Sequence, residues 1–299
     1  MWVLNPLTIT ADQVTASNIA EDDAPVWAPG TYAKAALAIH DHGLFESLVA
    51  DNTAEPGTDE LSWFRRSATN KFKPFDRKNS SPAQNAESIT YTIQPGVRID
   101  TLALIDTDAT EAAISITVPG QGVVFTETRQ AIRSENRATF YGWFFGERKY
   151  RRTLVFLDIP TYADVANATI DVTVSKPNGT AGLGEILMGR IWKVGITLYE
   201  TAPRLVSFSV DQRDAWGNLI LTKRRATRNV SYRFAIPPGE IEYLLDEFAN
   251  LTATELLFMG GNDIETFGTT LFGTFKDLTT PIEGPNATQA QIEVEGFMG

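Results

Sequence analysis

Short runs of strand-forming residues, each ended by Gly, Pro, Asn or Asp, constrain the fold of this chain most. Runs rich in Val, Ile, Thr, Tyr and Phe cover residues 88–93, 113–118, 153–157 and 168–174. β-Branched and aromatic residues favour strands, and many short strands separated by turn residues are typical of a β-sandwich or barrel. The sequence therefore predicts a mainly β protein.

One segment near the C-terminus has the periodicity of a helix instead. Within residues 238–251, Ile241, Leu244, Leu245 and Phe248 recur at the spacing of one helix face. We predict a helix there, and hence a module that combines this helix with strands.

Two stretches predict boundaries between modules. Residues 77–85 are polar and without periodicity, and they contain Pro82, which is typical of a linker. A second boundary is expected at Ala202-Pro203, after a run punctuated by glycines. We predict a small aromatic-rich β module in residues 1–78, an antiparallel β-sandwich in residues 79–200 and an α+β attachment module in residues 201–299.

The net charge of −11 is unevenly distributed. Residues 1–65 hold ten acidic and two basic residues, and residues 234–299 hold eleven acidic and one basic, which leaves +7 for residues 66–233. Acidic ends and a basic middle would give complementary patches if copies or neighbours pack together, and solvated faces would have the same composition. The acidic total disfavours nucleic-acid binding, which needs a concentrated Lys and Arg surface.

The sequence lacks the patterns of several kinds of site and of membrane or export segments. Cysteine is absent, so there is no disulfide and no thiolate metal site. The N-terminus has no secretory signal pattern, and no apolar run approaches the roughly 20 residues of a membrane span. Residues 182–184 do not continue into a dinucleotide fingerprint, and no phosphate-binding loop occurs. We expect no cofactor and no membrane span.

Patterns for catalysis are weak. His40 and His42 would share one face of a strand and could begin a metal site, or they could simply face solvent. No Gly-x-Ser-x-Gly elbow occurs. Loop carboxylates are candidates for a glycan hydrolase by number alone: Asp106, Asp108, Glu111 and Asp158. We therefore expect no enzyme and no metal.

Aromatic residues punctuate residues 25–63 in a regular order. Trp27 and Tyr32 precede a strand-like run with Phe45, an Asn-Thr turn and finally Trp63. This order resembles the small chitin-binding-type carbohydrate-binding modules, with Phe45 where a second tyrosine is usual. The resemblance implies that Trp27, Tyr32 and Trp63 form a platform for a sugar ring. In so small a module the same rings can instead form the core.

A second pattern follows directly. Trp63-Phe64-Arg65-Arg66 leads into residues 69–76, Thr-Asn-Lys-Phe-Lys-Pro-Phe-Asp. This combination resembles tailed-bacteriophage virion proteins, described as tail or baseplate proteins with a carbohydrate-binding domain; Lys71 and Phe72 depart from the pattern. The β-sandwich that the resemblance implies has matching pieces at residues 99–105, 141–145, 184–189 and 194–199, and residues 211–218 with Arg224-Arg225 resemble the C-terminal part.

The resemblance implies a structural component of a phage tail or baseplate, made in the host cytoplasm and located in the virion. Expected partners are other tail proteins, further copies in a symmetric homo-oligomer and a cell-surface glycan. The alternatives are a free glycan-binding accessory protein and a glycan hydrolase. The basic run Lys223-Arg224-Arg225 could pair with carboxylates of an adjoining subunit, or lie on a solvated hairpin.

Overall fold

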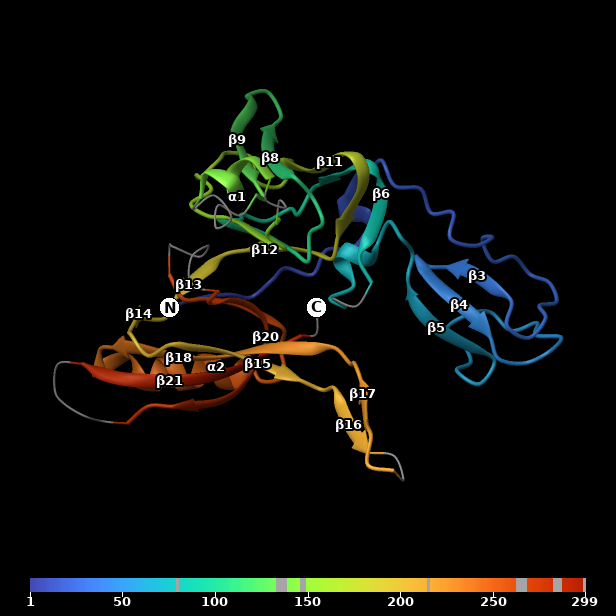
Figure 1. Cartoon of the computed structure of the whole chain (residues 1–299). Helices are drawn as coiled ribbons and strands as arrows, with labels where there is room; N and C mark the ends of the chain where they lie inside the picture. The colour runs from blue at the N-terminus through green and yellow to red at the C-terminus, as the bar shows by residue number, and fades with distance from the viewer. Residues whose placement is uncertain are drawn as a thin grey trace. The chain divides into compact units, whose positions relative to one another are not determined.

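The structure is a computed structural model, and it describes residues 1–78, 81–132, 139–145, 149–213, 216–261, 268–281 and 287–297 (Figure 1). The chain is mainly β, with several antiparallel sheets and a short C-terminal helix, so the predicted fold class is confirmed. Contacts divide it into a C-terminal unit (Met1–Leu7, Ile99–Leu102 and Met188–Gly299) and an N-terminal unit (Thr8–Arg98 and Ala103–Leu187). The module boundaries at residues 78 and 200 stay predictions.

A large antiparallel sheet organises the C-terminal unit. In the described residues its order is β13-β1-β19-β20-β21-β18-β14, with β15 also paired to β18. The strands are β1 (Trp2–Leu4), β13 (Ile191–Lys193), β14 (Ile196–Thr197), β15 (Ala202–Ser207), β18 (Ala226–Ile236), β19 (Leu256–Met259), β20 (Thr270–Thr279) and β21 (Thr288–Gly296). The N-terminal strand β1 thus pairs with strands from the C-terminal half.

One face of this sheet is apolar and packs against helix α2 (Ile241–Asn250). Alternate residues of β18 point to this face, so Tyr232 and Phe234 are buried against Leu244 and Phe248 of the helix. The helix predicted in residues 238–251 is confirmed, after a 3-10 turn at Pro238–Glu240. Leu245, expected on the buried face, is exposed.

A two-stranded hairpin extends the sheet of the C-terminal unit away from its core (Figure 1). Its strands are β16 (Val210–Arg213) and β17 (Leu219–Thr222), which pair only with each other among the described strands. It prolongs the β15–β18 hairpin, in which Ser207 pairs with Ala226. At its base the Phe208 N–H donates to the Arg225 carbonyl oxygen, 3.2 Å away. We call residues 208–225 the arm.

The N-terminal unit contains a five-stranded antiparallel sheet of order β2-β6-β11-β8-β9. Side chains alternate along β8 between buried and half-buried, as expected for a strand with one covered face. The strands are β2 (Val14–Ser17), β6 (Ala83–Ile93), β8 (Glu111–Val118), β9 (Gly122–Gln130) and β11 (Thr169–Leu183). A separate group of order β10-β7-β12 comprises β7 (Thr101–Ile105), β10 (Thr153–Phe156) and β12 (Glu185–Gly189).

Most strands predicted for this region are confirmed, and one predicted piece is wrong. The four runs from which the β class was inferred coincide with β6, β8, β10 and β11. Residues 141–145, expected as part of a sandwich strand, belong to helix α1 (Phe140–Phe145). The rings of Phe140 and Phe144 lie 4.8 Å apart, so aromatic contacts four residues apart stabilise the helical form.

A small three-stranded sheet, β3-β4-β5, follows the extended segment after β2. Its strands are β3 (Leu37–His40), β4 (Gly43–Ser47) and β5 (Trp63–Ala68). Asp41 and His42 join β3 to β4 with φ of 44° and 56°, the left-handed conformation that a two-residue hairpin turn needs. We call residues 25–68 the aromatic module.

In the part of the chain that the structure describes, no helix is long and apolar enough to cross a membrane.

Candidate functional site

The core of the aromatic module consists of Ala38, Phe45 and Trp63. Trp63 is 3% exposed, and its indole N–H donates to the Ala54 carbonyl oxygen at 2.8 Å. The buried Asn52 holds the same loop, because its side-chain amide donates to the Ser62 carbonyl oxygen at 2.8 Å. A satisfied polar group and a buried ring together indicate that Trp63 is a structural residue.

The other two residues predicted to bind sugar lie at the edge of this core. Trp27 and Tyr32 are half-buried and pack against it, with the Tyr32 ring 5.2 Å from the Trp63 ring. The Tyr32 hydroxyl donates to the Ala28 carbonyl oxygen at 2.9 Å. The three residues therefore share one core. Tyr32 meets Trp63 edge to face and Trp27 meets His40 edge to face, so the rings do not form one flat exposed platform.

A groove lies beside this core, between the end of β3, the start of β5 and residues 55–60. Its volume is about 770 Å³, and its lining combines the apolar Phe45, Trp63 and Phe64 with charged residues. The titratable lining residues are His40, Asp41, Glu55, Asp59, Glu60 and Arg65. Phe64 is 57% exposed, so it is the ring in this groove with a face free for a ligand. The sequence analysis did not select Phe64, because the resemblance to carbohydrate-binding modules pointed to its neighbour Trp63. Phe64 is on the solvent-facing side of β5.

Two hydrogen bonds favour the ionised form of Asp59 in this groove. The Ser62 hydroxyl and the Leu61 N–H both donate to Asp59. These two bonds, the Ser62 hydroxyl first, lower the pKa of the Asp59 carboxyl below its ordinary value. A ligand of this groove therefore meets a carboxylate as well as Arg65, which suits a neutral molecule with hydroxyl groups.

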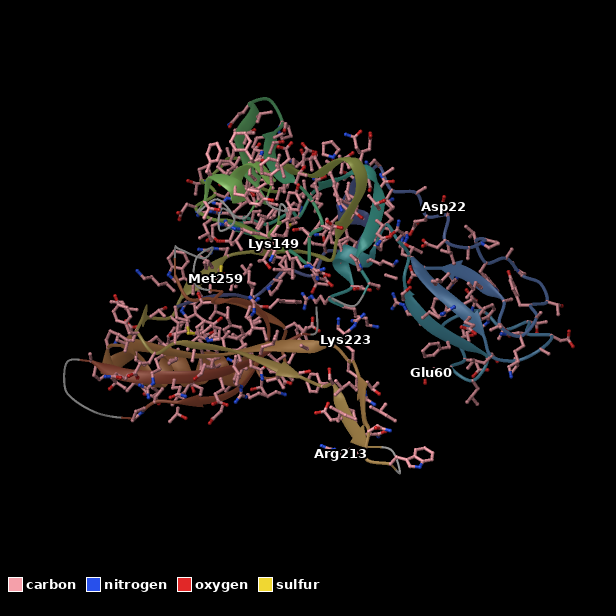
Figure 2. All side chains as sticks on the ribbon, viewed as in Figure 1. Asp22, Glu60, Lys149, Arg213, Lys223 and Met259 are labelled. Atoms are coloured by element: carbon pink, nitrogen blue, oxygen red, sulfur yellow. The ribbon has the colours of Figure 1, made fainter. Side chains whose placement is uncertain are left out.

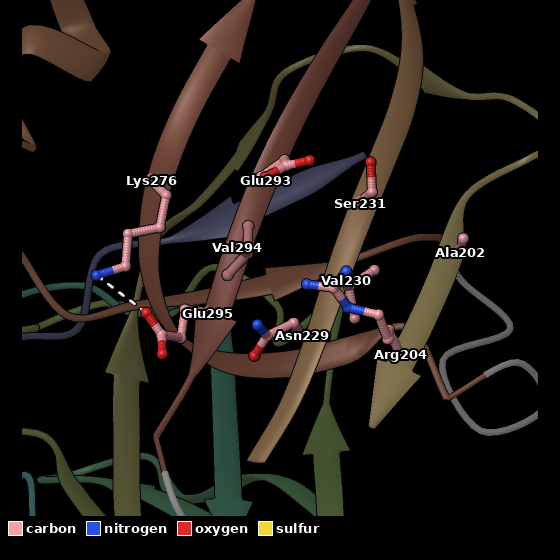
Figure 3. Close-up of a pocket in the computed structure, with 9 residues that line it drawn as sticks. All are labelled: Ala202, Arg204, Asn229, Val230, Ser231, Lys276, Glu293, Val294 and Glu295. Atoms are coloured by element: carbon pink, nitrogen blue, oxygen red, sulfur yellow. Dashed lines mark ion pairs between the residues drawn. The ribbon is translucent and has the colours of Figure 1, made fainter. Parts of the chain in front are cut away.

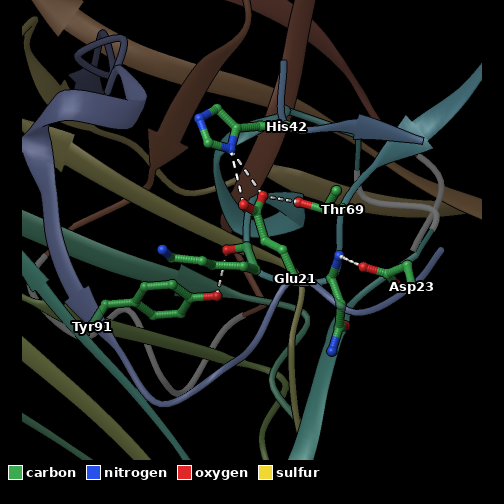
Figure 4. A network of polar contacts seen from close by, with 7 residues as sticks. Glu21, Asp23, His42, Thr69 and Tyr91 are labelled. Atoms are coloured by element: carbon green, nitrogen blue, oxygen red, sulfur yellow. Dashed lines mark hydrogen bonds and ion pairs between the residues drawn. The ribbon is translucent and has the colours of Figure 1, made fainter. Parts of the chain in front are cut away.

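A polar network fastens the extended segment before the aromatic module (Figure 4). His42 Nδ1 lies 2.9 Å from a Glu21 carboxylate oxygen, and the Thr69 hydroxyl donates to the same oxygen at 2.6 Å. The Asn70 N–H donates to Asp23 at 2.8 Å. The Thr69-Asn70 pair, read in the sequence as a phage-family signature, thus has a structural task here.

The two histidines do not share a strand face. β3 ends at His40, and His42 occupies the left-handed turn, so the ladder that would have aligned the rings stops between them. His40 Nε2 faces Glu55 at 3.5 Å, whereas His42 faces Glu21. Within the described ranges, no group of three or more His, Asp or Glu side chains is placed to hold a metal ion.

The loop carboxylates that sequence offered for hydrolysis are mostly held by neighbours. Asp106 pairs with Arg152 at 3.1 Å and Asp108 with Lys176 at 2.7 Å, and all four line a pocket of about 530 Å³. Glu111 accepts a hydrogen bond from Gln130 at 2.7 Å, and Asp158 is exposed. Because a glycosidase needs one protonated carboxyl as its acid, two cation-paired carboxylates do not favour this chemistry.

A shallow pocket lies on the polar face of the large sheet (Figure 3). Arg204 reaches over it from β15, and Lys276 pairs with Glu295 at 2.9 Å across β20 and β21. The polar lining residues of β18 and β21 alternate with buried residues of these strands, so the pocket lies on the solvated side of a one-faced sheet.

The apolar residues of β17, the second strand of the arm, are all exposed. All described residues from Asp211 to Thr222 are exposed, and Val210 is half-buried. Ile220 is 50% and Leu221 67% exposed. No reading of the sequence singled out these aliphatic residues, although an apolar Leu-Ile-Leu run between a Gly-Asn turn and a basic run is a visible signal.

The basic run lies at the base of the arm. Lys223, Arg224 and Arg225 are all exposed, and Figure 2 shows Lys223 at the base and Arg213 toward the tip. Of the run read as a family signature, residues 214 and 215 lie outside the described residues.

Comparisons of this chain with protein-family models, with curated proteins and with solved structures give no match.

Proposed function

We propose that this chain is a structural component of an oligomeric assembly, and that the assembly is a phage tail or baseplate. The likeness of residues 63–76 and 211–218 to tailed-phage virion proteins supports the kind of assembly. The observation that carries the structural role is the arm, a hairpin whose aliphatic side chains have no core to enter.

Burial of these side chains on a neighbour would be favourable. Fully burying one leucine or isoleucine contributes about 1.5–3 kcal/mol. An isolated two-stranded hairpin is at best marginally stable, and exposed apolar strands invite pairing with other chains. A projecting arm of this kind therefore fits a part whose final environment is an assembly.

Electron microscopy of particles labelled with antibodies against this chain tests the proposal. We expect label at a fixed place on the tail of virions purified from the cells that make the chain. Absence of the chain from purified particles, established also by mass spectrometry of their proteins, would reject the role.

The groove of the aromatic module favours glycan contact as a second task. It presents the exposed ring of Phe64 beside a carboxylate and a guanidinium, and sugars bind by packing C–H edges on rings while polar groups take their hydroxyls. A single weak site would suffice if many copies bind together.

Pull-down on insoluble chitin and on purified cell-wall polysaccharide tests this second task. We expect Phe64→Ala to abolish retention and Leu61→Ala to leave it unchanged, because Leu61 is also exposed but is not in the groove lining. Equal retention of both variants, or no retention of the wild-type chain on either polymer, would reject glycan binding in the groove.

A further inference from the structure

The arm presents apolar side chains on both of its faces. In the register of β16 and β17, Asp211 pairs with Leu221 and Arg213 with Leu219, while Gln212 pairs with Ile220. Paired residues share a face, so Leu219 and Leu221 lie together on one face and Ile220 on the other. A partner that covers the arm must therefore supply an apolar surface.

The arm and its flanks are also basic. Residues 203–228 hold six basic residues and two acidic ones, a net charge of +4. Three of the basic residues, Lys223, Arg224 and Arg228, are exposed around its base. The surface that receives the arm should therefore be acidic as well as apolar.

The solvent side of α2 has both properties. Residues 237–251 hold four acidic residues, Glu240, Glu242, Asp246 and Glu247, and no basic one, a net charge of −4. Between these carboxylates Tyr243 is 57% exposed and Leu245 is exposed.

A groove continues this acidic surface toward β13. Its volume is about 320 Å³, and Trp192, Ile236, Tyr243 and Glu240 line it together with Lys193. The Tyr243 ring meets the Trp192 ring edge to face at 6.1 Å, which leaves an aromatic floor beside the acidic helix.

Among the described residues, the arm and the α2 surface do not cover each other within one copy. The arm strands and the outer residues of α2 are exposed in the same chain, although both belong to the C-terminal unit. A single chain thus carries two complementary surfaces, with net charges of +4 and −4, and both are exposed to solvent.

We propose that the arm of one copy docks on the α2 surface and the Trp192–Tyr243 groove of a second copy. This inference rests on the proposed structural function, since it names the partner of the arm as this same chain. The contact joins two different surfaces, so each copy has one arm and one receiving site, and repetition closes a ring or extends a filament.

Charge reversal on each surface tests this pairing in the full-length chain. Sedimentation velocity should show oligomers of the wild-type chain that grow with concentration. We expect Lys223→Glu/Arg224→Glu and Glu242→Lys/Asp246→Lys each to raise the dissociation constant about 100-fold or more, because each puts like charges face to face. The control Lys34→Glu/Arg98→Glu makes the same change in net charge as Lys223→Glu/Arg224→Glu, but at exposed residues of the N-terminal unit, and should assemble as the wild type does.

A mixture of the two charge-reversed variants gives the sharpest outcome. The acidic arm of one variant then faces the basic helix of the other, and both remaining surfaces are native, so mixing should restore oligomers. Circular dichroism of each variant checks that it is folded. Lack of oligomers in the wild-type chain, or failure of the mixture to restore them, overturns the inference.

The two proposals fail in different ways. If the chain is present in virions but monomeric when purified, the structural function stands and the partner of the arm is another protein. If the chain is absent from virions but self-associates through the arm, the proposed contact between copies is supported and the phage role is rejected.

Discussion

The aromatic module and the arm are both small antiparallel β structures, yet they place their apolar side chains oppositely. In the module a third strand and the loop at residues 52–54 close over Trp63 and Phe45, which are buried. In the arm two strands stand without a covering layer, so Leu219 and Leu221 stay exposed. Apolar content alone therefore does not identify a contact surface. Apolar strands indicate such a surface where no other layer of the chain covers them.

The largest effect is expected from Trp63→Ala. The change removes a buried ring and leaves the Ala54 carbonyl oxygen without its donor, so the aromatic module should lose about 3–5 kcal/mol of unfolding free energy. Thermal or urea denaturation measures it. Phe64→Ala, next along the chain on the exposed side, should change stability by less than about 0.5 kcal/mol. Similar losses in both variants would break the distinction between the two faces of β5.

The arm should respond in the reverse way to the substitution pair Leu219→Ser/Leu221→Ser. Because neither side chain enters the core, the unfolding free energy should change by less than about 0.5 kcal/mol. Self-association should weaken more than about 100-fold, since each of the two leucines buried at a contact contributes about 1.5–3 kcal/mol. Denaturation and sedimentation of the same preparation separate the two effects. A stability loss comparable to that of Trp63→Ala would mean that the arm is part of the core.

A smaller effect is expected where the aromatic module is fastened to its preceding segment. Glu21→Gln replaces the carboxylate that meets His42 and Thr69, at a cost of about 1–2 kcal/mol for hydrogen bonds to a charged group. Hydrogen exchange of the amides in residues 21–24 should become faster, whereas Asp22→Asn, at an exposed neighbouring residue, should leave it unchanged. Equal exchange rates in the two variants would show that the network does not fasten this segment.

The last expected effect is a pH dependence of the unit that carries the arm. In a chain that begins at Met1, burial, with Lys193 as the second cause, lowers the pKa of the Met1 amine from 8.0 to about 5. Between these values the unfolded chain binds more protons than the folded one, so stability should rise from pH 5 to pH 8. Denaturation monitored by exchange of β1 and β19 amides measures it. Acetylation of the amine should flatten this dependence; an unchanged slope would assign it to another group.

The sequence predicted the parts of this fold that depend on local patterns. The strand runs at β6, β8, β10 and β11 were visible because they are rich in β-branched and aromatic residues and end at turn residues. The helix α2 was visible because its apolar residues recur at helical spacing. α1 was missed because five of the six residues 140–145 are aromatic, which favours strands. The contact between Phe140 and Phe144 that stabilises the helix is not visible in the composition.

The candidate site was predicted less well, for a physical reason. Burial of Trp63 and exposure of Phe64 follow from which face of β5 the strand β4 and the loop of Asn52 cover, and sequence order does not state this. The arm escaped prediction because its Leu-Ile-Leu run resembles any buried strand. The arm is uncovered because of the three-dimensional arrangement of β15 and β18, the strand pair that it extends. The sequence does not state this arrangement.

Hydrogen exchange measured at low and at high protein concentration tests the central claim most directly. If the exposed arm is a contact surface between copies, amides of β16, β17 and α2 should gain protection as concentration rises, while amides of β3, β4 and β5 exchange at constant rates. Protection in the arm that does not depend on concentration, or a gain confined to the aromatic module, would contradict the account.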